Sequence, residues 1–139
     1  MERRGIMEKI KVAIVGYGNI GKYAVEAVEA APDMKLVGVV RRPSSIQHMP
    51  SELKEVKVVS DILELGQVDV AILCVPTRSI LDIAKKMLAL GIHTVDSYDV
   101  HGQLWDLRQN LDVIAKENGA VSILSAGWDP GTDSIIRVL

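Results

Sequence analysis

Residues 10–21 read IKVAIVGYGNIG, and this stretch decides the fold of the chain. Its first half, from Ile10 to Val15, is rich in β-branched residues and predicts a strand that ends at Gly16. Its second half begins a helix over residues 19–31, whose apolar side chains recur at helical spacing until Pro32 ends it. The stretch therefore predicts a strand, a tight turn and a helix in direct succession.

The turn carries glycines in a G-x-G-x-x-G pattern. Gly16 permits the tight turn, Gly18 lets the backbone approach a pyrophosphate, and Gly21 lets the helix pack closely on the strand. The free N–H groups at the start of the helix would bind the pyrophosphate. The alternative is a glycine-rich turn without a ligand, but the flanking strand and helix favour a dinucleotide site.

Short β-branched runs alternate with helical patterns along the rest of the chain. The further predicted strands are 35–40, 56–59, 68–75, 92–95 and 121–124, the helices are 60–65, 79–90 and 103–117, a polar loop covers 44–55, and Pro130 begins a last helix. This order implies right-handed crossovers and a parallel sheet. We predict an α/β fold with a doubly wound parallel sheet of the Rossmann type, whose ligand lies beyond the carboxyl ends of the strands.

Composition limits the kind of protein this is. The 139 residues make one domain, and 48% hydrophobic with 24% charged residues can bury a core. The net charge of −2 offers no basic surface for nucleic acid or a membrane. Without a signal peptide or an apolar span, a cytoplasmic protein is expected. The single Cys74 excludes an internal disulfide, and the scattered His48, His93 and His101 predict no metal site.

The end of the second predicted strand distinguishes between the two nicotinamide nucleotides. An NAD site usually has Asp or Glu about 20 residues after the glycines, where it binds the ribose 2′-hydroxyl. The chain has Arg41 and Arg42 there instead, and two guanidinium groups suit a 2′-phosphate. NADP is therefore favoured over NAD, with a solvated basic turn as the alternative.

The fourth predicted strand runs into Cys74, Val75, Pro76 and Thr77. In a doubly wound sheet this loop passes beside the ribose and nicotinamide of the cofactor. Cys74 itself is favoured as a small core residue over a nucleophile, because a buried thiol without a base is inert.

Polar residues also follow the fifth and sixth predicted strands. Asp96 to His101 include two acids where a substrate would meet the nicotinamide, and Trp128 with Asp129 could bind an ammonium group. From spacing alone, three other roles are equally favoured: Asp96 as a turn cap, His101 as an exposed loop residue and Asp129 as a helix cap.

Several motifs, in this order, closely resemble the meso-diaminopimelate dehydrogenase family. They are VAIVGYGNIG at 12–21, PDM at 32–34, LVGV at 36–39, TVDSYD at 94–99 and GWDPG at 127–131. The first is shared by many dehydrogenases, whereas the Tyr-Asp and Gly-Trp-Asp-Pro-Gly motifs are far more specific. The similarity extends from about Ile10 to Leu139.

The resemblance implies NADP-dependent, reversible oxidative deamination of the D-configured centre of meso-2,6-diaminopimelate. The products would be L-2-amino-6-oxopimelate, ammonia and NADPH, on the route linking lysine and cell-wall precursors. It implies Asp99 and Asp129 as the catalytic acids, which bind the substrate together with Trp128. The cofactor contacts that it implies, besides Gly16, Gly18 and Gly21, are Tyr17, Asn19, Ile20, Arg41, Arg42, Cys74, Val75, Pro76, Thr77, His101, Gly102 and Gln103. Pro43 departs from the family, in which another Arg can occur at that position.

Members of the family continue into a second domain that binds the distal part of the substrate and supports dimerisation. We therefore expect an N-terminal tail over 1–9, a dinucleotide-binding domain over 10–130, and over 131–139 the start of a helix leading to an absent second domain. The chain would be a fragment, a truncated gene product or half of a split enzyme, inactive alone, with a homodimer or a complementary C-terminal chain as its partner.

Two other functions compete with this one. Another two-domain reductase, such as dihydrodipicolinate reductase or homoserine dehydrogenase, would share the first motif but would not explain Trp128-Asp129 following Tyr98-Asp99. The alternative from a different functional class is a stand-alone NADP(H)-binding module without catalysis.

Overall fold

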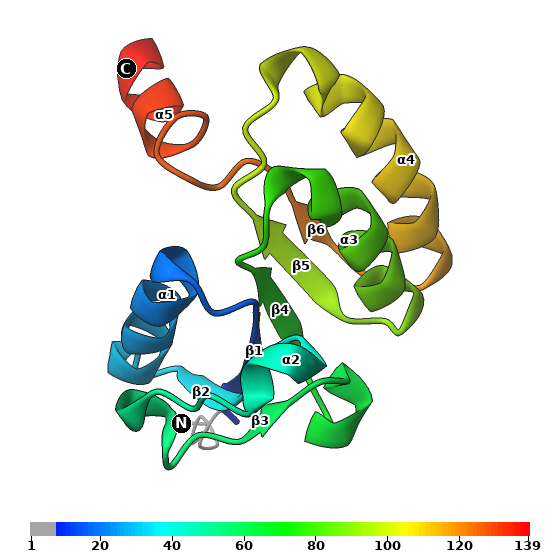
Figure 1. Cartoon of the computed structure of the whole chain (residues 1–139). Helices are drawn as coiled ribbons and strands as arrows, with labels where there is room; N and C mark the ends of the chain where they lie inside the picture. Colours follow the sequence, from blue (N-terminus) through cyan, green and yellow to red (C-terminus); the bar gives the residue numbers. More distant parts are fainter. Residues whose placement is uncertain (1–7) are drawn as a thin grey trace, which may run out of the picture.

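Alternating strands and helices build one parallel sheet with helices on both of its faces in the computed structural model, which describes residues 8–139 (Figure 1). The strands are β1 (Ile10–Val15), β2 (Met34–Val40), β3 (Val58–Val59), β4 (Val70–Leu73), β5 (His93–Asp96) and β6 (Ser122–Ile123). The α-helices are α1 (Asn19–Ala30), α2 (Pro43–Ile46), α3 (Ile80–Ala89), α4 (Leu104–Glu117) and α5 (Thr132–Val138). Short 3₁₀ turns are η1 (Ser51–Leu53), η2 (Ile62–Leu65), η3 (Thr77–Ser79) and η4 (His101–Gln103). Residues 1–7 of the predicted N-terminal tail lie outside the described residues.

The strand order confirms the doubly wound sheet. It runs β3-β2-β1-β4-β5-β6, and every pairing is parallel. The chain moves outward from β1 to β3, then returns to the centre and moves the other way from β4 to β6. The order thus reverses between β1 and β4, the place where ligands of such sheets bind.

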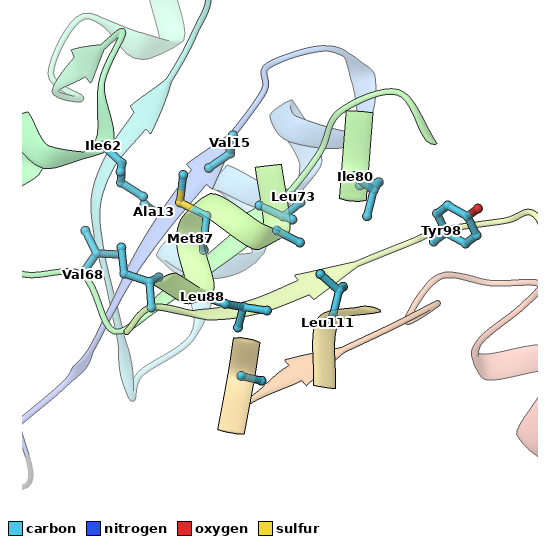
Figure 2. Close-up of a cluster of buried hydrophobic side chains, with 14 of the residues drawn as sticks. Ala13, Val15, Ile62, Val68, Leu73, Ile80, Met87, Leu88, Tyr98 and Leu111 are labelled. Atoms are coloured by element: carbon cyan, nitrogen blue, oxygen red, sulfur yellow. The ribbon is translucent and has the colours of Figure 1, made fainter. Parts of the chain in front are cut away.

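Alternation along β1 divides the core between the two faces of the sheet. Val12 and Ile14 pack with residues of α1 and with Leu53 in η1 on one face. Ala13 and Val15 pack on the other face, with residues of α3 and α4 such as Met87, Leu88 and Leu111 (Figure 2). Because successive strand residues point to opposite faces, one short apolar strand supplies both cores.

The elements differ from the predicted ones mainly at their ends. The predicted strands 68–75 and 121–124 shorten to their central residues, and the predicted strand 56–59 shortens to its last two. The predicted helix 60–65 is the single 3₁₀ turn η2. Of the strand predicted to be buried on both faces, Ala71 and Leu73 are buried, whereas Val70 and Ile72 are partly exposed. The last helix begins at Thr132 and not at Pro130.

The prediction of a polar loop over residues 44–55 is wrong. This segment contains most of α2 and all of η1, and Leu53 is only 1% exposed in the core. Pro43 is the first residue of α2, where its fixed φ favours the first helical turn. Ile46, Met49 and Leu53 are the apolar residues of this segment, and only Leu53 is buried, so its burial follows no regular period that the sequence could reveal.

Candidate functional site

The turn between β1 and α1 accepts only glycine at two of its three glycine positions. Gly16 has a φ of +92°, and a Cβ there would lie 2.3 Å from the carbonyl oxygen of Cys74. A Cβ on buried Gly21 would lie 2.3 Å from the carbonyl oxygen of Gly16. Both close contacts are with backbone atoms, so the turn, α1 and the end of β4 pack together without room for a side chain.

Gly18 lies in a different environment, at the start of α1. A Cβ there would have no atom within 4 Å. No side chain caps α1, and its first turn contains no acidic residue. The positive end of the helix dipole and its N–H groups are therefore directed at open space, an arrangement suited to an anion.

Tyr17 links the glycine turn to the segment that follows β2. Its hydroxyl donates a hydrogen bond to Glu52 Oε1 over 3.0 Å, and the guanidinium of Arg41 lies 5.5 Å from the centre of its ring. Arg41 also donates to the carbonyl oxygen of His48, at 3.1 Å. Burial, and then the hydrogen bond to Glu52, raise the pKa of Tyr17 to about 12, so the phenol is neutral at physiological pH.

The two arginines after β2 differ in how they are held. Arg41 is partly buried and held by two contacts, whereas Arg42 is exposed directly before α2. The sequence placed both near the glycine turn but missed Glu52, which also lies 4.0 Å from Lys22 Nζ. Glu52 belongs to the supposed loop, and no spacing relative to the glycines distinguishes it.

Cys74 lies at the end of β4, against the glycine turn. Its N–H donates to the carbonyl oxygen of Val15 over 2.7 Å, and its side chain packs with the α1 side of the core. Burial raises the pKa of the thiol to about 11. These features fit the small packing residue that the sequence favoured and not a nucleophile.

The loops after β4 and β5 meet through two predicted site residues. The hydroxyl of Thr77 donates a hydrogen bond to Asp99 Oδ1 over 2.7 Å. These residues are 22 positions apart. Because β4 and β5 pair in parallel, the loops that follow them lie together at the carboxyl ends of the strands. The turn η4 follows in the loop after β5, and its three residues His101, Gly102 and Gln103 are all exposed.

Asp96, at the end of β5, is buried and caps a turn. Its Oδ1 accepts the N–H of Tyr98 at 2.9 Å and the N–H of Ser125 at 3.1 Å. The first bond is the turn cap that the sequence left as an alternative, and the second joins the loop after β6. Burial raises the pKa of Asp96 against the opposing effect of these two hydrogen bonds.

Trp128 and Asp129 lie in the loop between β6 and α5. The Trp128 side chain is exposed, and Asp129 is paired with Arg137 of α5, with 3.7 Å between Oδ2 and Nη2. Asp129 does not cap α5, because Gly131 occupies the capping position. The two predicted acids have separate partners, Thr77 for Asp99 and Arg137 for Asp129.

Two surface hollows lie away from these residues. One, of about 270 Å³, lies between α4 and β6, and another, of about 560 Å³, lies between α3 and α4. Neither is lined by a predicted site residue. The described part of the chain contains no group of three or more His, Cys, Asp or Glu side chains that could hold a metal ion. Over the same residues, every helix is too short or too polar to cross a membrane.

Comparison with known proteins confirms the resemblance inferred from the sequence. The chain is 59% identical to meso-diaminopimelate D-dehydrogenase from Bacteroides fragilis, over 96% of this chain and 44% of that protein. It is 36% identical to the solved structure of C. glutamicum DAP dehydrogenase in complex with DAP, with a TM-score of 0.80 over 95% of this chain and 40% of that one.

An engineered D-amino acid dehydrogenase bound to NADP⁺ is also similar. It shares 36% identity with this chain, with a TM-score of 0.78 over 94% of this chain and 40% of that one. The chain thus spans less than half the length of each of these three proteins. The model of the oxidoreductase family with the NAD-binding Rossmann fold matches residues 10–123. The chain therefore belongs to that oxidoreductase family and has its NAD(P)-binding Rossmann fold.

Proposed function

We propose that this chain binds NADP(H), with the pyrophosphate across the start of α1. The observation that carries the proposal is the contrast between the glycines: Gly16 and Gly21 have no room for a Cβ, while Gly18 borders open space at an uncapped helix. A pyrophosphate at that place would accept hydrogen bonds from the free N–H groups and benefit from the helix dipole. Tyr17, Asn19 and Ile20 would complete this part of the site.

The preference for NADP over NAD rests on the arginines after β2. A ribose 2′-phosphate beside β2 would meet the guanidinium groups of Arg41 and Arg42 in place of the acid that binds a 2′-hydroxyl. Arg41 is partly immobilised by Tyr17 and His48, which lowers the entropy cost of binding. A similar solved structure is bound to NADP⁺, which supports the same choice here.

The loops after β4, β5 and β6 are proposed to complete the site. Cys74, Val75, Pro76 and Thr77 would border the nicotinamide ribose, and His101, Gly102 and Gln103 would contact the cofactor from η4. We propose that the chain supplies the nucleotide-binding part of a meso-diaminopimelate dehydrogenase, a substrate assignment supported by the relative with 59% identity.

Each candidate acid would then have a chemical role. A carboxylate of Asp99 or Asp129 can hold the substrate ammonium and accept a proton from it, while Trp128 covers the substrate with an apolar face. NADP⁺, when bound, supplies the acceptor for the hydride from the α-carbon. The Thr77 hydroxyl fixes one oxygen of Asp99, so the other oxygen remains available to the substrate.

A module that binds NADP(H) without catalysis is the second candidate. It is favoured by the ion pair between Asp129 and Arg137, because a paired carboxylate is less available to a substrate ammonium. Reduction of NADP⁺ by meso-diaminopimelate, after the C-terminal part of the Bacteroides fragilis relative is added to the chain, would support the dehydrogenase. Persistent inactivity with NADPH bound would support the module.

Nucleotide affinity tests the first proposal. We expect Arg41→Asp to weaken NADPH binding at least about tenfold, close to 1.4 kcal/mol, and NADH binding less than about threefold. The reason is that only NADPH carries the 2′-phosphate that the Arg41 guanidinium would bind. Isothermal titration calorimetry of the whole chain with each nucleotide measures both values.

Arg108→Asp is the matched control for this experiment. Arg108 also lies over an aromatic ring, 5.1 Å from the centre of Trp105, but on α4. Its replacement should leave both affinities unchanged. Equal losses for NADPH and NADH in Arg41→Asp would refute the 2′-phosphate assignment, and no saturable heat with NADPH in the parent chain would refute nucleotide binding.

A further inference from the structure

Asp96 is a buried acid without a role in the proposed chemistry. It is the last residue of β5, which pairs with β4 on one side and β6 on the other. The residue is 2% exposed, and one of its two side-chain oxygens, Oδ2, has no hydrogen-bond partner among the described residues. A buried carboxylate loses hydration, so its retention at this position calls for a compensating interaction.

The compensating interactions come from two loops. Oδ1 of Asp96 accepts the N–H of Tyr98 in the loop after β5 and the N–H of Ser125 in the loop after β6. The first loop continues directly into Asp99, and the second leads to Trp128 and Asp129. One oxygen atom therefore binds both segments that carry the candidate substrate residues.

Two further hydrogen bonds join the same loops. The backbone oxygen of Asp96 accepts the N–H of Ala126 at 2.7 Å, and the hydroxyl of Ser125 donates to the backbone oxygen of Tyr98 at 2.7 Å. Ser125 has a φ of +56°, a conformation that a non-glycine residue rarely adopts without support from its surroundings. These bonds provide that support.

An apolar side chain at position 96 would avoid the loss of hydration but would leave two amides without an acceptor. A buried N–H group without a partner is strongly destabilising, and both groups belong to residues that are themselves buried. The acceptor oxygen is thus the property of Asp96 that the two loops require, rather than its charge.

We propose that Asp96 is a positioning residue that holds the loop carrying Asp99 and the loop carrying Trp128 and Asp129 in one fixed arrangement. The substrate role of those loops rests on the proposed function, whereas the connection between them does not. Asp96 acts through the backbone of its neighbours, because its side-chain oxygen accepts the N–H groups of Tyr98 and Ser125.

Amide hydrogen exchange of the whole chain, followed by mass spectrometry, tests the proposal. In Asp96→Ala we expect exchange to accelerate at least about tenfold in both residues 97–103 and residues 124–131, because the shared acceptor is lost. In Asp96→Asn the acceptor oxygen remains, but an NH₂ group replaces Oδ2, which has no partner among the described residues, so we expect an acceleration several-fold smaller than in Asp96→Ala. Rescue by Asn distinguishes the acceptor role from a role of the negative charge.

Asp61→Ala is the control, because Asp61 Oδ1 also accepts a backbone N–H, that of Leu63, at the start of η2. Its effect should be confined to residues 61–66. Should Asp96→Ala not fold, Ser125→Ala removes one bond between the loops and should accelerate exchange in both.

Acceleration in only one loop, equal acceleration in Asn and Ala variants, or a uniform increase that includes β1 would each overturn the proposal. The measurement uses no nucleotide or substrate. A failure of NADPH binding therefore does not affect the outcome of the exchange experiment. A failure of the exchange experiment likewise does not affect the nucleotide-binding result.

Discussion

At the scale of single residues, burial decides the chemistry of Cys74. Cys74 directly follows β4 and lies beside the glycine turn, and its backbone carbonyl group packs against Gly16. Only the thiolate reacts with electrophiles, and desolvation disfavours the charged form. With a pKa of about 11, the thiol remains protonated over the physiological range.

Alkylation by iodoacetamide measures this effect. At pH 8 we expect Cys74 in the folded chain to react on the order of a hundredfold more slowly than in the chain unfolded in guanidinium, whose cysteine has a pKa of about 8.5. The folded rate should rise about tenfold per pH unit up to pH 10, because the thiolate fraction rises in that proportion. Mass spectrometry gives both rates. Labelling at pH 8 at the unfolded rate would show that the thiol is accessible and ionised.

Single residues differ in how far the sequence predicts their surroundings. Arg41 and Arg42 could be placed because they directly follow a strand whose end is fixed by the fold. The hydrogen bond between Thr77 and Asp99, by contrast, depends on side-chain rotamers in two loops, and no spacing encodes it. The same holds for Glu52, whose partner Tyr17 is 35 positions away.

At the scale of elements, the approach of α1 to β1 depends on glycine. We expect Gly21→Ala to lower the free energy of unfolding by about 2–3 kcal/mol, because its Cβ would overlap a backbone oxygen that cannot move independently. Urea denaturation followed by circular dichroism measures the loss. A change below about 0.5 kcal/mol would show that α1 can shift away from β1 without cost.

Gly18→Ala is the matched comparison, since its methyl group would enter open space. Gly18 has a φ of −97°, which alanine adopts readily, so stability should change by less than about 0.5 kcal/mol. The same methyl group would occupy the space proposed for the pyrophosphate, and NADPH affinity should fall at least about tenfold. Unchanged affinity would contradict the proposed position of the pyrophosphate.

Elements with a strong hydrophobic period were predicted well, and those without one were not. The predicted helices 79–90 and 103–117 agree with α3 and α4 to within one residue at either end, because each buries an apolar stripe against the sheet. The segment 44–55 has no such stripe. Its short elements form because Pro43 begins a turn and Leu53 reaches the core, two events that leave no repeating pattern.

At the scale of the whole molecule, the strand order determines where the site lies, independently of the side chains that line it. The reversal between β1 and β4 brings the glycine turn and the loop after β4 together, and this much followed from the alternating pattern of the sequence. The relation of α5 to the sheet did not follow. In Figure 1, α5 lies beyond the helices that cover the sheet, and it has no buried residue.

This position of α5 leads to a prediction about stability and association. Ile135, Ile136, Val138 and Leu139 are all exposed, as are Val121 and Ile123 at the β6 edge of the sheet. Because α5 buries no apolar residue, removing residues 132–139 should change Tm by less than about 2 °C.

The same deletion should reduce self-association, since it removes a cluster of exposed apolar side chains. Calorimetry measures Tm, and sedimentation velocity over a range of concentrations measures association. The matched variant Val121→Thr with Ile123→Thr keeps α5 and alters only the sheet edge, so it separates the two surfaces. A fall in Tm of more than about 5 °C on deletion would show that α5 packs against the domain in solution, and the description of α5 as separate from the core would then be wrong.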